Sequence, residues 1–190
     1  MPIYSSNTKI NNWRRWVSDQ ITGNDTDIST LQSQSLTLLE TAATTSGTSV
    51  TIGSVPAGTQ KIDIVFSGVS LDGSNDLRIR LGDSGGIETS GYESDCSRFT
   101  ATGVTTTTAT GSIRMSRAVA DNNNSGVISA FHVGSNKWVF AGSLNDADSS
   151  TNLLTVVGEK TLSGELTQIE LTPASSDNFD AGSVTVFTTG

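Results

Sequence analysis

The chain has 190 residues, of which 34% are hydrophobic and 16% charged, and its formal net charge is −8. The low charged fraction argues against a self-repelling disordered chain, and the abundance of Ser, Thr, Gly and Asn favours short strands joined by turns. The acidic balance repels phosphate backbones and anionic lipid, so we expect no nucleic-acid partner and no binding to a membrane surface.

Cysteine content and hydropathy indicate in which cellular compartment the chain assembles. Cys96 is the only cysteine, which excludes an intramolecular disulfide and a cysteine-based metal cluster within one chain. No stretch approaches the ~20 apolar residues that a membrane helix needs, and Met1 to Asn12 contains no apolar run of signal-peptide length. We therefore expect assembly in a reducing cytoplasm, without membrane insertion.

The first 45 residues carry a heptad pattern. Gly23 weakens its middle, and Asp27 can cap a second helical stretch. We predict a helical, coiled-coil-like stem over residues 1–45 that associates with partner chains, because so thin an amphipathic helix buries little by itself. The positions spaced alternately four and three apart are Ile10, Arg14, Val17, Ile21, Asn24, Ile28, Leu31, Ser35, Leu38 and Ala42.

Two tryptophans stand out in this segment. Trp13 and Trp16 flank a pair of arginines and supply a large apolar surface for so short a stretch. Packing at a helix interface inside an oligomer is one interpretation, and docking to another protein is the other, because aromatics and arginines are typical interface anchors. The predicted trimerisation or docking residues are Trp13, Trp16, Val17, Ile21, Ile28, Leu31 and Leu38.

From Ser46 onward the apolar period changes to two, which is typical of strands with one buried face. The clearest case is residues 77–81, where leucine and isoleucine alternate with arginine. Gly, Asn, Asp and Ser clusters separate the candidates, so we predict a mainly β fold with a β-sandwich or jelly-roll-like domain over residues 46–190. About nine strands are expected, at residues 50–52, 62–66, 77–81, 113–119, 127–133, 137–143, 153–157, 166–171 and 183–188. The polar run Thr105 to Thr108 is either an exposed edge or a strand that meets another subunit.

Residues 82–86 spell GDSGG, which matches the nucleophile segment of trypsin-like serine proteases. That mechanism needs a histidine base beside the serine, and in that family the histidine lies far upstream. The only histidine here is His132, which lies downstream. We predict a glycine-rich turn after the strand and no catalysis, and therefore no enzyme.

Acidic residues gather around this turn, namely Asp83, Glu88, Glu93 and Asp95. They are either solvated loop acids or ligands of a structural cation, and their spacing does not match an EF-hand. We assign no metal and no cofactor. His132, alone on a strand, is expected to be an ordinary packed or exposed side chain.

Three aromatic residues have two interpretations. Trp138, Tyr92 and Phe99 are either core residues or a platform on which a sugar ring stacks, and we favour the core for Trp138. Loops tend to carry binding residues because a rigid sheet supports them. The predicted receptor-facing residues are Asp83, Glu88, Tyr92, Glu93, Asn123 and Asn145.

The segment VPAGTQKIDIVFSGVSLDGSNDLRIRLGDSGGIETSGY, residues 55–92, resembles a module of bacteriophage tail-fibre proteins. The phrase FDAGSVTVF, residues 179–187, resembles the closing strand of the same module. This resemblance implies a β-sandwich module near the distal end of a fibre, a trimeric habit and no catalytic residues. The N-terminal segment matches no shaft or anchoring domain of that family.

The resemblance and the heptads together lead to the expected function. We expect a homotrimeric virion subunit of a tail fibre that binds another virion protein and attaches to a host surface polysaccharide or protein. The alternative is a non-adhesive capsid decoration or head-fibre protein. The predicted location is the virion.

Overall fold

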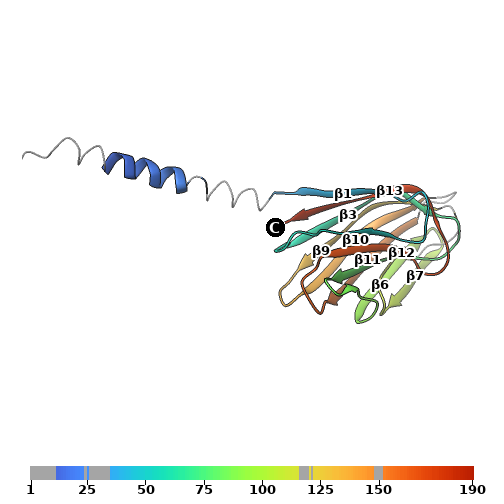
Figure 1. The fold of residues 1–190 in the computed structure, drawn as a ribbon. Helices are drawn as coiled ribbons and strands as arrows, with labels where there is room; N and C mark the ends of the chain where they lie inside the picture. Colours follow the sequence, from blue (N-terminus) through green and yellow to red (C-terminus); the bar gives the residue numbers. More distant parts are fainter. Residues whose placement is uncertain (1–11, 24, 26–34, 116–119, 121, 148–151) are drawn as a thin grey trace, which may run out of the picture. The chain divides into compact units, whose positions relative to one another are not determined.

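The computed structural model describes residues 12–23, 25, 35–115, 120, 122–147 and 152–190, and it is mainly β with one short helix (Figure 1). The chain divides into two compact units, Met1–Ser35 and Leu36–Gly190. The second unit contains two antiparallel sheets that share one hydrophobic core. The mainly β prediction is therefore confirmed.

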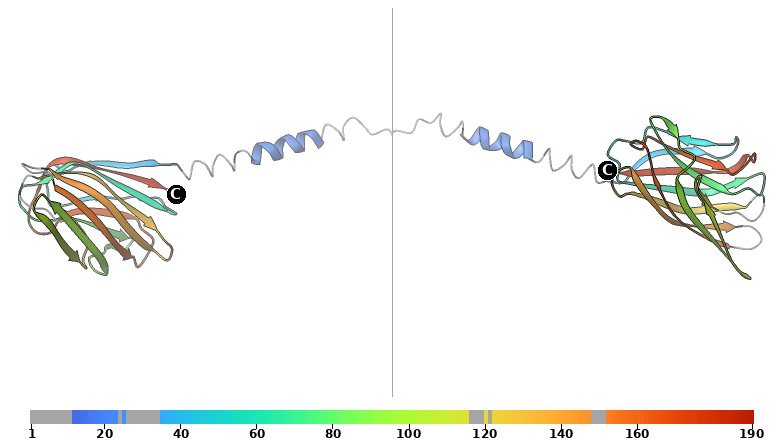
Figure 2. Two further views of the ribbon diagram at one scale, coloured as in Figure 1. Left: turned by 180° about the vertical axis from the view of Figure 1, so that it is seen from behind. Right: turned by 90° about the horizontal axis from the view of Figure 1, so that it is seen from below.

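The larger sheet has eight strands, and every neighbouring pair in it is antiparallel. The C-terminus lies beside the start of its first strand, because Thr37 pairs with Thr188 (Figure 1). Figure 2 shows the same strands from two further sides. In spatial order they are β1 (Thr37–Ala43), β13 (Phe179–Thr189), β3 (Lys61–Leu71), β9 (Asn123–His132), β10 (Lys137–Ala147), β11 (Asn152–Thr161), β6 (Tyr92–Thr100) and β7 (Gly103–Ala109).

The smaller sheet has five strands and is also antiparallel. Asp83 ends one strand and Gly86 begins the next, so the GDSGG segment forms the turn predicted for it. The order is β2 (Val50–Ile52), β12 (Gln168–Pro173), β4 (Leu77–Asp83) and β5 (Gly86–Ile87), and β8 (Ile113–Met115) pairs with β4 off this path.

Alternation along the strands builds the core. Ile62, Ile64 and Phe66 of β3 are buried while the residues between them are partly exposed. Leu77, Ile79 and Leu81 of β4 repeat the pattern in the smaller sheet. Each such side chain removes apolar surface from water at about 25 cal/mol per Å², so one core stabilises both sheets.

The predicted stem is wrong at its C-terminal end. Leu38 and Ala42 were placed on a helix, but both lie in β1, which pairs with β13 at the edge of the larger sheet. Leu39 and Ala42 pack against the core from this strand. The threonine-rich sequence around them favours a strand, and pairing with β13 satisfies backbone groups that an isolated helix end leaves open. The β unit therefore begins at Leu36 instead of residue 46.

The first unit contains a helix over residues 12–23, with residue 25 also helical. Trp13, Trp16 and Ile21 on it are 64%, 60% and 56% exposed, whereas Val17 is half-buried. Ile28 and Leu31 lie outside the described residues. No helix in the described part of the chain is long and apolar enough to cross a membrane.

Candidate functional site

Two of the acidic residues, Asp83 at the end of β4 and Glu88 after β5, are committed to bonds within the fold. Asp83 is buried, and its carboxylate accepts the Gly85 N–H and the Ser163 hydroxyl, each at 2.7 Å. Glu88 Oε2 lies 2.5 Å from the ammonium of Lys160, and its Oε1 accepts the Ser163 N–H at 2.8 Å. Burial raises the pKa of Glu88, but hydrogen bonds from Lys160 and Ser163 outweigh burial and lower it. These bonds tie the loop after β4 to the loop after β11.

Tyr92 was expected to face a receptor, and the structure corrects this. Its side chain is 1% exposed, and its hydroxyl accepts the Leu81 N–H at 2.7 Å and donates to the Glu88 carbonyl at 3.0 Å. Burial raises the pKa of Tyr92 to about 12. The ammonium of Lys160 lies 5.1 Å from the centre of its ring. Tyr92 therefore offers neither an exposed ring for a sugar to stack on nor a hydroxyl free to bind it.

The other predicted receptor residues lie on strands instead of loops. Glu93 is exposed on β6, Asn123 is exposed on β9, and Asn145 on β10 accepts the Ser125 N–H at 2.7 Å. Phe99 is 43% exposed near the end of β6. Phe99 and Asn145 both pair in register with Leu153 and lie near Asn123 at one end of the larger sheet, whereas Glu93 lies toward the other end of β6.

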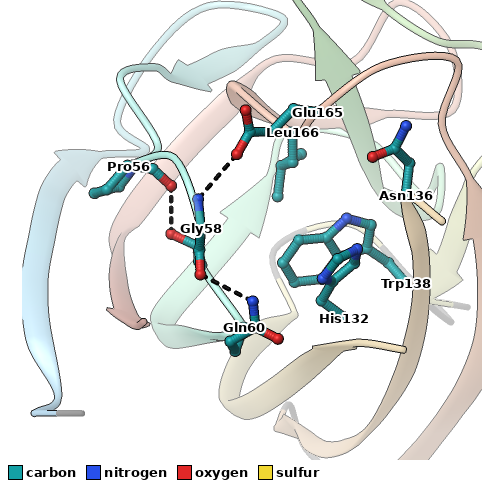
Figure 3. A pocket seen from close by; sticks show the side chains of 9 residues that line it. Pro56, Gly58, Gln60, His132, Asn136, Trp138, Glu165 and Leu166 are labelled. Atoms are coloured by element: carbon teal, nitrogen blue, oxygen red, sulfur yellow. Dashed lines mark hydrogen bonds between the residues drawn. The ribbon is translucent and has the colours of Figure 1, made fainter. Parts of the chain in front are cut away.

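A different group of residues lines a pocket of about 230 Å³. It comes from three segments of the β unit: the turn before β3, the ends of β9 and β10 with the turn between them, and the loop after β11. Figure 3 shows the rings of His132 and Trp138 together on one side of it. The lining residues are Pro56, Gly58, Thr59, Gln60, His132, Asn136, Trp138, Glu165 and Leu166.

The ring side of the pocket is rigid. Trp138 is 3% exposed and belongs to the core, as the sequence predicted, and the centre of its ring system lies 5.2 Å from that of His132 at an interplanar angle of 33°. The backbone N–H of His132 donates to the Gln60 carbonyl oxygen at 2.9 Å and holds β9 to the turn before β3. Leu166, which also lines the pocket, is buried.

The polar side of the pocket is organised by a turn at residues 56–59. Glu165 Oε1 accepts the Gly58 N–H at 2.9 Å, and Gln60 Nε2 donates to the Gly58 carbonyl at 3.0 Å (Figure 3). The Thr59 hydroxyl donates to the Pro56 carbonyl at 2.7 Å. These bonds fix a carboxylate and an amide at the pocket while leaving Glu165 Oε2 and Gln60 Oε1 without a hydrogen bond to the described residues.

The turn between β9 and β10 has an unusual backbone. Ser135 and Asn136 have φ angles of 51° and 56°, and the Lys137 N–H closes the turn on the Gly134 carbonyl at 2.9 Å. Two successive positive φ angles are typical of a type I′ turn, in which Gly and Asn are preferred and Ser is strained. The Asn136 carbonyl accepts the Leu162 N–H at 3.0 Å, which anchors this turn beside the end of β11.

No protein-family model, curated protein or solved structure matches this chain. The site is therefore interpreted from its own geometry. Among the described residues, no group of three or more His, Cys, Asp or Glu side chains could hold a metal ion.

The sequence singled out two of the lining residues, His132 and Trp138; for Trp138 the core was favoured over a sugar-stacking role, and His132 was given no role in binding. Glu165, Gln60 and Asn136 are single polar residues in turns, and nothing in their local sequence distinguishes them from solvated loop residues. Residues 58 and 165 are far apart in the sequence, and only the pairing of the strands brings them together. A signal was present at Ser135 and Asn136, because GSNK between two apolar alternations indicates a tight hairpin.

Proposed function

We propose that the chain is a homotrimeric subunit of a bacteriophage tail fibre, carried on the virion, that attaches to a host cell surface and catalyses no reaction. The observation that carries this proposal is the division into a helical unit with exposed tryptophans and a β unit with its own core and pocket. One unit suits docking to another virion protein or to sister subunits, and the other suits recognition. The resemblance of residues 55–92 and 179–187 to tail-fibre modules supports the same assignment.

The two sheets over one core suit a β-sandwich of unequal sheets, which is the finer architecture we propose for Leu36–Gly190. Such a scaffold holds its turns rigidly, so a binding group on a turn loses little freedom when a ligand binds. The helix over residues 12–23 is proposed as part of a stem, with Trp13, Trp16, Val17 and Ile21 along its apolar side.

Association of copies has support in the β unit as well. Val127, Phe131, Leu153 and Val157 on β9 and β11 are each at least 40% exposed on a partly apolar outer face of the larger sheet. Exposed apolar surface of this kind marks contact surfaces more often than free ones. We propose that sister subunits cover part of this face in the trimer.

Attachment is tested by incubating fluorescently labelled full-length chain with a panel of bacterial strains and with particles of the virus that encodes it. Saturable labelling of at least one strain, displaced by unlabelled chain, is expected. A chain that labels no strain but coats virus particles acts as a decoration protein, and that result contradicts adhesion. Release of reducing sugar from host polysaccharide would contradict the non-enzymatic part of the proposal.

The role of the helix is tested with Trp13→Ala/Trp16→Ala. Truncating both rings removes most of the exposed apolar surface of the helix, so incorporation into virus particles should fall while labelling of bacteria persists. Ser18→Ala, on the polar side of the same helix, is the matched control and should be incorporated normally. Loss of bacterial labelling with normal incorporation would reverse the assignment of the two units.

A further inference from the structure

We infer that the pocket between His132, Trp138, Asn136 and Glu165 binds a single neutral pyranose ring. This inference rests on the proposed adhesive function and names the chemistry of its ligand. It concerns residues 56–60, 132–138 and 165–166, which differ from the receptor-facing residues that the sequence indicated.

The size of the pocket limits the ligand. Sites for drug-sized molecules span about 300–1,000 Å³, so a volume of about 230 Å³ accommodates one small ring. A longer saccharide would have to extend outside the pocket. The recognised unit is therefore a terminal or side-branch sugar of a surface polysaccharide.

The apolar side of the pocket matches the C–H face of a sugar ring. Pro56 and Leu166 line the pocket together with the packed rings of His132 and Trp138. The near-complete burial of Trp138 means that His132, which is half-buried, offers most of the accessible ring surface, because the ring of Pro56 points away from the other two rings (Figure 3). Rings fixed by packing offer apolar contact area at little cost in side-chain entropy.

The polar side of the pocket matches hydroxyl groups. Glu165 offers a carboxylate oxygen as acceptor, and the side-chain amide of Asn136 offers both a donor and an acceptor, since neither forms a hydrogen bond to the described residues through these atoms. Gln60 Oε1 is a further acceptor. Hydroxyls both donate and accept, so this set of groups suits a sugar better than a purely cationic or anionic ligand.

Charge argues for a neutral sugar. Glu165 is the only Asp, Glu, Lys or Arg among the lining residues, and the whole chain carries a net charge of −8. Both would repel a uronic acid, a sialic acid or a phosphorylated sugar. A neutral hexopyranose avoids that repulsion while still using the carboxylate as an acceptor.

The backbone at the turn is compatible with an amide side chain at the pocket. Asn136 has a φ angle of 56°, a conformation that Asn tolerates better than most residues. Asn136 lines the pocket and Ser135, the neighbouring residue of the same turn, does not.

The direct test is calorimetric or NMR titration of the full chain with methyl glycosides of glucose, galactose, mannose and N-acetylglucosamine. We expect at least one to bind, with a dissociation constant of roughly 1 mM, as is reasonable for a few hydrogen bonds and one small apolar contact. The resonances of His132 and Trp138 should shift. Absence of binding by all four glycosides, up to the limit of their solubility, would overturn the inference.

The decisive comparison is Asn136→Gly against Ser135→Gly. Both place glycine at a position of positive φ in the same turn, so both should raise the thermal midpoint or leave it unchanged. Only Asn136→Gly removes amide hydrogen bonds to the sugar, so it should weaken glycoside binding about tenfold while Ser135→Gly binds normally. Equal affinities in the two variants would overturn the inference.

Glu165→Gln is a second variant that keeps the shape of the pocket. It should weaken binding several-fold because a carboxylate accepts hydroxyl protons more strongly than a neutral amide. Glu93→Gln removes an exposed carboxylate from the outer face of β6 and serves as its control.

The outcomes separate this inference from the proposed function. A chain that binds a glycoside but labels no bacterium refutes adhesion and leaves the sugar site standing. A chain that labels bacteria, binds none of the glycosides and labels equally well as Asn136→Gly refutes the sugar site and leaves adhesion standing.

Discussion

At the scale of single residues, polar side chains in this protein divide into those that hold the fold and those that remain available. Asp83, Glu88 and Tyr92 form a bonded group between β4, β6 and the loop after β11. Glu165 and Asn136 line the pocket and keep side-chain atoms without a hydrogen bond to the described residues. The acidic character of the sequence is therefore a poor guide to function until the hydrogen bonds are known.

Tyr92 should make stability fall at alkaline pH. Burial raises its pKa to about 12, against an ordinary value of 10.0, so the folded state holds the phenol proton more tightly than the unfolded state does. The stabilisation is complete below pH 10 and is lost as pH rises from 10 to about 12. Urea unfolding should show a loss of roughly 2–3 kcal/mol across this window.

Tyr92→Phe provides the comparison for that loss. The variant should be about 1–3 kcal/mol less stable at pH 7, because the buried Leu81 N–H loses its acceptor. It should also show a flatter decline between pH 10 and 12, since the shifted phenol is gone. An equally steep decline in both proteins would mean that Tyr92 does not titrate in this window.

The Glu88–Lys160 ion pair should make the stability of the protein fall at acidic pH. The pKa of Glu88 lies below its ordinary value of 4.5 in the folded state, so its contribution is present above that pH and is lost as pH falls below it. Lys160 is 4% exposed, and Lys160→Met should reduce this acid-dependent loss, while the hydrogen bonds from Ser163 to Glu88 remain. Lys137→Met, at a more exposed ion pair with Glu159, should leave the acid profile almost unchanged.

At the scale of elements, alternation of apolar residues predicted the strands whose buried positions are large and aliphatic, as in residues 62–66 and 77–81. It missed β6, where the buried positions include Ser94 and Cys96, because small and polar residues give no hydrophobic period. It also placed β1 in a helix, because the heptad spacing continued by chance into a threonine-rich edge strand. The pocket was missed because it is assembled from three distant turns.

The irregular pairing of β13 with β3 depends on Gly182. Its φ is +90°, and a Cβ there would lie 2.3 Å from the Gly68 carbonyl oxygen. Gly182→Ala should therefore destabilise the protein by at least about 2 kcal/mol, because a rigid backbone must move and the left-handed conformation is strained. Gly103→Ala, on β7 with no atom within 4 Å of the added Cβ, should have a small effect in the same urea experiment.

At the scale of the whole molecule, the account depends on two units with different tasks. The β unit has its own core and should fold without the first unit. Light scattering of the full chain should give the mass of a trimer, and a truncated chain beginning at Leu36 should remain folded but associate less strongly. A monomeric full chain would contradict the trimer, and an unchanged trimer after truncation would leave the helix with docking alone.

The central proposal, that this chain is the adhesive end of a viral fibre, is tested most directly by a cryo-electron microscopy map of virus particles that contain it. The account predicts three copies at the distal end of a tail fibre, with the pocket of each β unit open to solvent. Copies distributed over the capsid surface, or with the pocket buried against another virion protein, would contradict it.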